Sequence, residues 1–248
     1  MITFLKANEQ HQHPNGGGWV ANTAFVSDTA YIGPNALVSD DAQVYGNARV
    51  YGDARVSGDA RVFGDAQVYG DAWVSGSARV YGNAQVYGDA WVYSDARVYS
   101  YAQVFGDAQV FGDAQVFGDA QVYGDAQVSG YAQVSDNARV YGNARVYSYA
   151  QVFGKARVFG DAWVFGDARV YGDAQVFGDA WDTSPLYIRG SKHSATNTKH
   201  GYIAIGCEVH SYAEWLKDYK AIGKAAGYTK EQIKEYKAII DLFVKVGR

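Results

Sequence analysis

The sequence predicts a mainly β protein, a triangular solenoid of about nine coils that ends in a small hairpin and two helices. Every sixth residue from Val20 to Val176 is aliphatic, which makes 27 uninterrupted six-residue units, and from Ala24 to Ala174 the residue two places earlier is always Ala. Side chains at i and i+2 of a strand share a face, so Ala and Val line one interior. Gly with Asp or Asn then turns the chain. Since six residues are too few for a hairpin, three units close a coil of 18 residues.

The repeats divide the chain into a leader and N-terminal cap (1–17), a solenoid (18–182) and a C-terminal cap of mixed α and β structure (183–248). Open solenoid ends expose unpaired strands, so we expect a capping device at each end. Asp182 stands where the next Val is due, which ends the repeat, and residues 186–209 are predicted to form a hairpin.

Two helices are predicted to follow the hairpin. Ser211 with Glu214, and Thr229 with Gln232, have the spacing of capping boxes, in which the two side chains bond each other's backbone. Gly227 between the helices suits a C-cap.

The repeat pattern resembles the hexapeptide-repeat, left-handed parallel β-helix proteins over about two thirds of the chain. The opening "GGWV" with "ARVYGDARV"-type units, and the later "IGCEVHSYAEW", look like uncharacterised hexapeptide-repeat proteins of bacteria and their prophages. Such proteins are often labelled acyltransferases or polymer-forming proteins. The left-handed coil and a phage origin are what the resemblance implies.

Composition excludes several classes of protein. The formal charge is −4, and residues 183–248 carry eleven Lys and Arg against six Asp and Glu, which is too little for a protein that binds long nucleic acids. The single Cys207 cannot form an internal disulfide, and no apolar run is long enough to span a membrane. We therefore expect a soluble, cytoplasmic protein without a membrane partner, in the host cytoplasm if it is phage-encoded.

The 18-residue coil assigns each outward residue to one of three faces. On the first face, an interface is predicted from five of the six Trp residues: Trp19, Trp73, Trp91, Trp163 and Trp181. Exposed Trp side chains usually mark interfaces, so a homo-oligomer, trimeric or dimeric, is expected. The alternative is that the terminal segments cover some of these rings.

The second face carries a candidate ligand site. Three successive coils place an Arg with an aromatic residue two positions later: Arg61, Arg79 and Arg97 with Phe63, Tyr81 and Tyr99. Guanidinium and aromatic groups together suit a nucleotide-like anion, through phosphate hydrogen bonds and base stacking. The alternative is a surface ion-pair ladder with the corner residues Asp65, Asp89 and Asp95.

The third face carries an unbroken aromatic column from Tyr51 to Phe177, which is expected to be structural. Corner positions depart from Asp or Asn at Tyr131 and Tyr149, which are 18 residues apart. These two are expected to stack and to edge a groove or a subunit contact.

No catalytic residue, metal site or cofactor is predicted. The solenoid contains no His; the five are His11, His13, His193, His200 and His210. Cys207 and His210 are close in sequence, but Cys207 is expected to be a buried strand residue. Three functions remain: a non-enzymatic binding protein that self-associates and sequesters a ligand such as a cyclic nucleotide used in host defence, a scaffold or filament component, and an acyltransferase.

Overall fold

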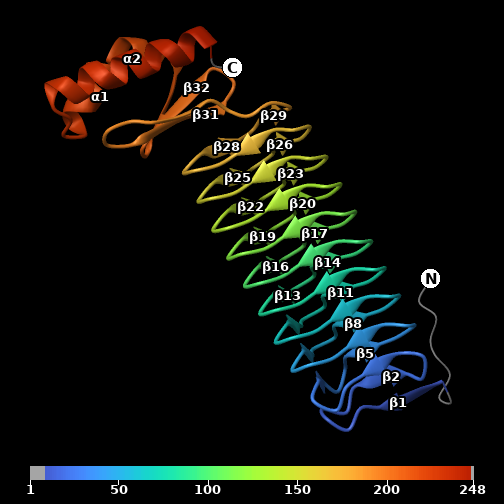
Figure 1. The fold of residues 1–248 in the computed structure, drawn as a ribbon. Coiled ribbons are helices and arrows are strands. Elements are labelled where there is room, and N and C mark those ends of the chain that lie inside the picture. The colour runs from blue at the N-terminus through green and yellow to red at the C-terminus, as the bar shows by residue number, and fades with distance from the viewer. Residues whose placement is uncertain (1–8, 247–248) are drawn as a thin grey trace.

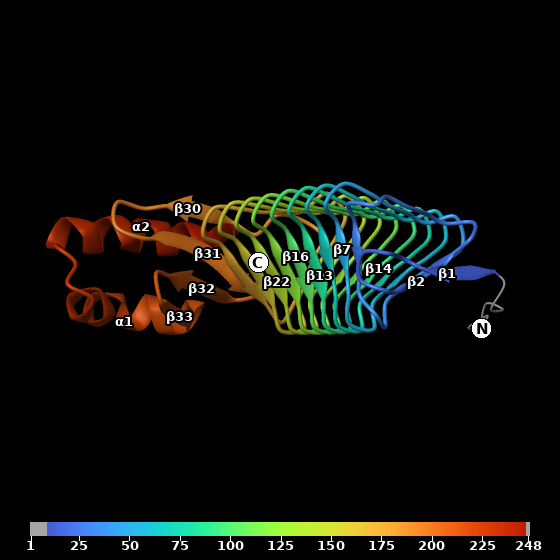
Figure 2. The same cartoon turned by 90° about the horizontal axis from the view of Figure 1, so that it is seen from below.

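The computed structural model describes residues 9–246, so residues 1–8 of the predicted leader lie outside it (Figure 1). Each predicted unit forms one short strand: the 27 units are β2 to β28, arranged as three sheets of parallel strands. The predicted solenoid is therefore confirmed. The coils stack into a long prism, and the C-terminal cap lies beyond the last of them (Figure 2).

The three sheets are the three faces. The first-face sheet contains β1 (Gln10–Gln12), β2 (Trp19–Ala21), β5 (Leu37–Val38), β8 (Arg55–Val56), β11 (Trp73–Val74), β14 (Trp91–Val92), β17 (Gln109–Val110), β20 (Gln127–Val128), β23 (Arg145–Val146), β26 (Trp163–Val164) and β29 (Ala180–Trp181). The second-face sheet contains β3 (Phe25–Val26), β6 (Gln43–Val44), β9 (Arg61–Val62), β12 (Arg79–Val80), β15 (Arg97–Val98), β18 (Gln115–Val116), β21 (Gln133–Val134), β24 (Gln151–Val152) and β27 (Arg169–Val170). The third-face sheet contains β4 (Tyr31–Ile32), β7 (Arg49–Val50), β10 (Gln67–Val68), β13 (Gln85–Tyr87), β16 (Gln103–Phe105), β19 (Gln121–Tyr123), β22 (Arg139–Tyr141), β25 (Arg157–Phe159) and β28 (Gln175–Phe177).

The interior is built from the Ala and Val of the units. From Ala30 to Val176 these side chains are fully buried and form one continuous core, while Ala24 and Val26 at the first end are half-buried. Backbone hydrogen bonds join each coil to the next in the 18-residue register, as where Arg79 N donates to Ala96 O over 2.9 Å. Burial and the ladder together fix which residues face outward.

Glycine turns most corners in a conformation that few other residues adopt. Gly112, for example, has φ of +68°, and a Cβ placed on it would lie 3.0 Å from the backbone nitrogen of Gly130 in the next coil. Coils are therefore spaced as closely at the corners as along the strands.

The N-terminal end is covered, as expected. β1 pairs antiparallel with β2. On the third face, Ile32 N donates to Asn15 O and Gly18 N donates to Ile32 O. A Cβ on Gly16 would lie 2.2 Å from the carbonyl oxygen of Ile32, so only glycine fits this approach.

The C-terminal cap contains four strands where the sequence predicts a hairpin of two. They are β30 (Tyr187–Arg189), β31 (Ser194–Lys199), β32 (Tyr202–Ile205) and β33 (Glu208–Ser211), in an antiparallel sheet. The hairpin prediction is wrong because β31 is polar along its length yet buried at Ala195, Thr196, Asn197 and Thr198. It contacts β28, which joins the cap to the last coil.

The two predicted helices are α1 (Tyr212–Ala225) and α2 (Lys230–Val246). Both capping boxes are confirmed, since Ser211 and Glu214 bond reciprocally, as do Thr229 and Gln232. The helices pack on the sheet around a second core. Neither described helix is long and apolar enough to cross a membrane.

Candidate functional site

The second face brings Arg61, Arg79 and Arg97 together. Arg79 lies in register between the other two on neighbouring strands β9, β12 and β15, and all three side chains are exposed. Within residues 9–246, none of the three forms an ion pair with a carboxylate. The alternative of an ion-pair ladder is therefore not seen: Asp65, for instance, accepts a hydrogen bond from Asn47 Nδ2.

The aromatic residues beside this Arg row stack on each other. Phe63 and Tyr81 have ring centroids 4.8 Å apart, Tyr81 and Tyr99 5.0 Å apart, and both pairs are parallel. Tyr45 and Phe117 continue the column at its two ends. Both faces of each middle ring are therefore covered, so these rings offer a ligand only their edges. The expectation that a base stacks on them is wrong.

A groove lies further along the same face, where the Arg row gives way to Gln. It has a volume of about 490 Å³, within the range of about 300–1,000 Å³ typical of ligand sites. Arg97, Tyr131 and Tyr149 are the predicted site residues that it brings together. The residues that sequence reasoning missed are Asp113, Gln115, Gln133, Gln151, Asp167 and Arg169. All of them follow from adding 18 to Arg97 or to the corner residue Asp95, so the signal was present in the register.

Tyr131 and Tyr149 stack as expected. Their rings are parallel, with centroids 5.0 Å apart, and they are 53% and 61% exposed. They project from the corners between the first and second faces and form one side of the groove.

The first face does not carry a continuous Trp band. Trp73 and Trp91 meet edge to face, with centroids 5.3 Å apart, and Trp73 Nε1 donates to Ser57 Oγ. Trp91 is 45% exposed. Trp19 and Trp163 are exposed too, but other coils separate them from this pair, and Arg145 lies over the ring of Trp163.

Trp181 does not belong to this exposed face. It pairs with Val164, whereas Trp163 pairs with Ala180. The last coil is therefore one residue short, and this turns Trp181 inward, where it is 1% exposed and closes the core. The prediction that Trp181 continues the outward Trp register is wrong for that reason.

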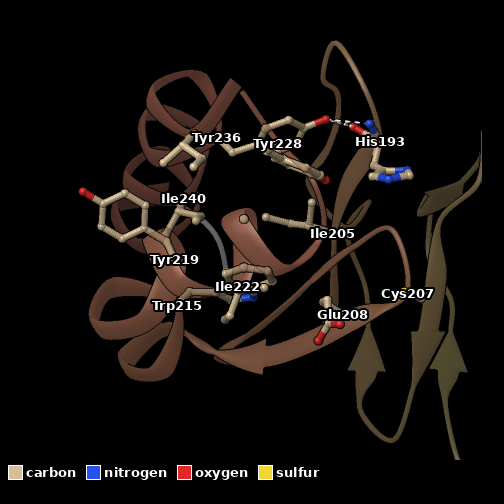
Figure 3. Close-up of a pocket in the computed structure, with 13 residues that line it drawn as sticks. His193, Ile205, Cys207, Glu208, Trp215, Tyr219, Ile222, Tyr228, Tyr236 and Ile240 are labelled. Carbon is tan, nitrogen blue, oxygen red and sulfur yellow. Dashed lines mark hydrogen bonds between the residues drawn. The ribbon is translucent and has the colours of Figure 1, made fainter. Parts of the chain in front are cut away.

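The C-terminal cap encloses a small apolar pocket between α1, α2 and the sheet (Figure 3). Its volume is about 60 Å³, far below that of an ordinary ligand site. The Tyr236 hydroxyl donates to His193 O over 2.7 Å and accepts from His193 N. Burial, and then the neighbouring Tyr236, raise the pKa of Tyr228 to about 12. This pocket is a packed interior with a polar rim.

Cys207 and His210 are not brought together as a nucleophile and base. Cys207 is exposed in the turn between β32 and β33, so the expectation of a buried strand residue is wrong. His210 Nε2 instead lies 2.9 Å from Glu208 Oε2, and its ring meets Trp215 edge to face. At the other end, His11 contacts Asn22 and His13 contacts Asn15.

Comparison with known proteins agrees with the fold. Six segments match the YdcK beta solenoid repeat: residues 42–55, 54–67, 66–82, 78–94, 120–135 and 132–148. With the observed coils, this match fits a left-handed β-helix hexapeptide-repeat protein, as the sequence resemblance implies. No curated protein matches the chain. Among solved structures, Francisella novicida UDP-N-acetylglucosamine acyltransferase is similar with a TM-score of 0.39 and 13% identity, over 89% of this chain and 78% of that one.

Proposed function

We propose that the protein is a non-enzymatic binding protein whose second face holds an anionic small ligand with a ring, such as a cyclic nucleotide. The observation that supports this is the position of Arg79, in register between Arg61 and Arg97 with none of the three paired to a carboxylate in the described chain. If the chain is phage-encoded, sequestration of a host-defence nucleotide is the corresponding role.

The electrostatics of the Arg row favour an anion. Parallel coils lie about 4.8 Å apart, so adjacent guanidinium groups repel each other, and a phosphate across them relieves the repulsion. Arg also binds phosphate with two parallel hydrogen bonds. Because the rings of Phe63, Tyr81 and Tyr99 cover each other, the base of a nucleotide would lie on guanidinium planes or ring edges.

A thermal-shift assay with a panel of cyclic nucleotides tests this proposal. A nucleotide that raises the Tm of the native protein should no longer do so with Arg79→Ala. Arg55→Ala is the matched control, because Arg55 is an exposed Arg of the first face. A panel without any shift, or an equal loss with both variants, would overturn the proposal.

We also propose self-association through the first face, as a trimer or dimer. Its support is the pair Trp73 and Trp91, together with the exposed rings of Trp19 and Trp163. Large exposed apolar side chains are enriched at interfaces. Native mass spectrometry of the wild type should show an oligomer that Trp91→Ala weakens. A single-chain mass at micromolar protein would contradict it.

The two other functions make different predictions. A scaffold should form particles that grow with concentration, although the C-terminal cap beyond the last coil opposes end-to-end growth. An acyltransferase should release free thiol from acetyl-CoA when given an acceptor. His193, His200 and His210 lie in the cap and not on the coils, so no described His faces the groove.

A further inference from the structure

The groove beside Tyr131 and Tyr149 is a local departure from the repeat. Elsewhere in this corner row the residue is short and polar: Thr23, Asp41, Asp59, Ser77, Asp95, Asp113 and Asp167. Two large rings replace them in consecutive coils and remain more than half exposed. Ser129 and Ser135, on either side of Tyr131, stand where most coils have an aromatic residue, so the neighbouring surface is cleared.

The floor of the groove offers uncommitted amides. Gln115, Gln133 and Gln151 lie in register along the second face. Gln115 accepts a hydrogen bond from the Tyr99 hydroxyl. The side chains of Gln133 and Gln151 have no hydrogen-bond partner among residues 9–246. An amide both donates and accepts, which matches a hydroxyl group on a ligand.

The charges of the groove balance. Asp113 and Asp167 stand beyond the two rings in the corner row, while Arg97 and Arg169 stand at the two ends of the Gln row. Arg97 and Arg169 are four coils apart, or roughly 19 Å. A site of this length without net charge favours an elongated, uncharged ligand over an anion.

Peptide binding by strand addition is excluded at this place. β18 and β21 are hydrogen-bonded on both sides, to β15 and β24 as well as to each other. A peptide that adds to a sheet needs an unpaired edge, which the middle of this face lacks. The ligand must therefore be recognised by side chains alone.

We infer that this groove binds a linear, uncharged oligosaccharide. Sugar rings present C–H groups that pack against aromatic rings such as Tyr131 and Tyr149, and hydroxyls that exchange hydrogen bonds with amides and carboxylates. Gln133 and Gln151 supply the amides, and Asp113 and Asp167 the carboxylates. The inference goes beyond the proposed anion site and does not depend on it.

An array of neutral linear oligosaccharides, followed by calorimetric titration of the best one, tests the inference. Tyr131→Ala and Tyr149→Ala should each weaken binding by about tenfold. Tyr101→Ala is the matched control, because Tyr101 is 63% exposed at a different corner, outside the groove. Each variant should keep the Tm of the wild type, since the rings removed are exposed.

Two further measurements separate this site from the Arg row. Arg79→Ala should leave oligosaccharide binding unchanged, and raising NaCl from about 50 mM to about 500 mM should do the same, because a neutral ligand is not screened. Binding of no array member would overturn the inference. So would an equal loss with Tyr101→Ala, or strong weakening by salt, which would indicate an anion in the groove.

Discussion

Val164 and Trp181 lie opposite each other on the neighbouring strands β26 and β29, where an unbroken repeat would place Trp163 opposite Trp181. This shift by one residue places the largest buried side chain of the solenoid over its last coil. The indole of Trp181 thus covers a Val and Ala interior that would otherwise meet water.

Trp181→Ala should therefore destabilise the last coils by about 3–5 kcal/mol, as large truncations in cores do. Because solenoid stability is a sum over neighbouring coils, the loss should appear first at the C-terminal end. Urea unfolding combined with amide exchange measures both effects. Trp163→Ala, which removes an exposed ring, should cost less than about 1 kcal/mol. Equal losses would contradict the capping role of Trp181.

Corner glycines should differ according to whether the next coil lies against them. Gly112→Ala places a Cβ 3.0 Å from Gly130 N, whereas Gly178, at φ of +84°, has nothing within 4 Å. Both substitutions pay about 1–2 kcal/mol for the left-handed conformation. Only Gly112→Ala should cost more than this, as denaturant midpoints can show. A greater loss at Gly178 would mean that coil spacing does not limit these corners.

The start of α1 should depend on Ser211. Ser211→Ala should cost about 1 kcal/mol, because the side chain caps Glu214 N. Hydrogen bonds from Ser211 also hold the pKa of Glu214 below its ordinary value. That contribution to stability is present above the ordinary carboxyl pKa and is lost as pH falls through the lowered one. NMR titration of Ser211→Ala should show the Glu214 pKa rising, and an unchanged pKa would contradict the capping box.

The C-terminal cap should loosen at high pH through Tyr228. Burial, with Tyr236 second, raises its pKa to about 12. Folding then favours the neutral phenol, so this stabilisation is complete below the ordinary pKa of 10.0 and is lost as pH rises toward about 12. Absorbance at the phenolate band should show one late-titrating Tyr that Tyr228→Phe removes. Loss of that late step from Tyr236→Phe alone would reassign the group.

The solenoid could be predicted from sequence because its units repeat one physical solution. Val and Ala recur at fixed spacing, so each strand and each face follow from counting, and the stacked column from Tyr51 to Phe177 is confirmed pair by pair. The exceptions escaped the count. A corner one residue shorter moves Trp181 from outside to inside, and counting in sixes cannot detect it.

The C-terminal cap was harder to predict because its buried strand is polar. Thr196, Asn197 and Thr198 lie inside the cap although Thr and Asn usually indicate a loop. The groove lies between these cases. Tyr131 and Tyr149 stood out in the sequence, but the depth beside them depends on how the Gln side chains of the next strands are arranged.

The uniform interior has a genetic consequence. A replication slip that adds or removes six residues would keep every Ala and Val in place, but it would move all later outward residues to the neighbouring face. An insertion between Arg79 and Arg97 would then split the Arg row without harming the core. Only events of 18 residues preserve both. Variants of this gene that keep a working surface should therefore differ in length by whole coils, and variants that keep only the fold by single units.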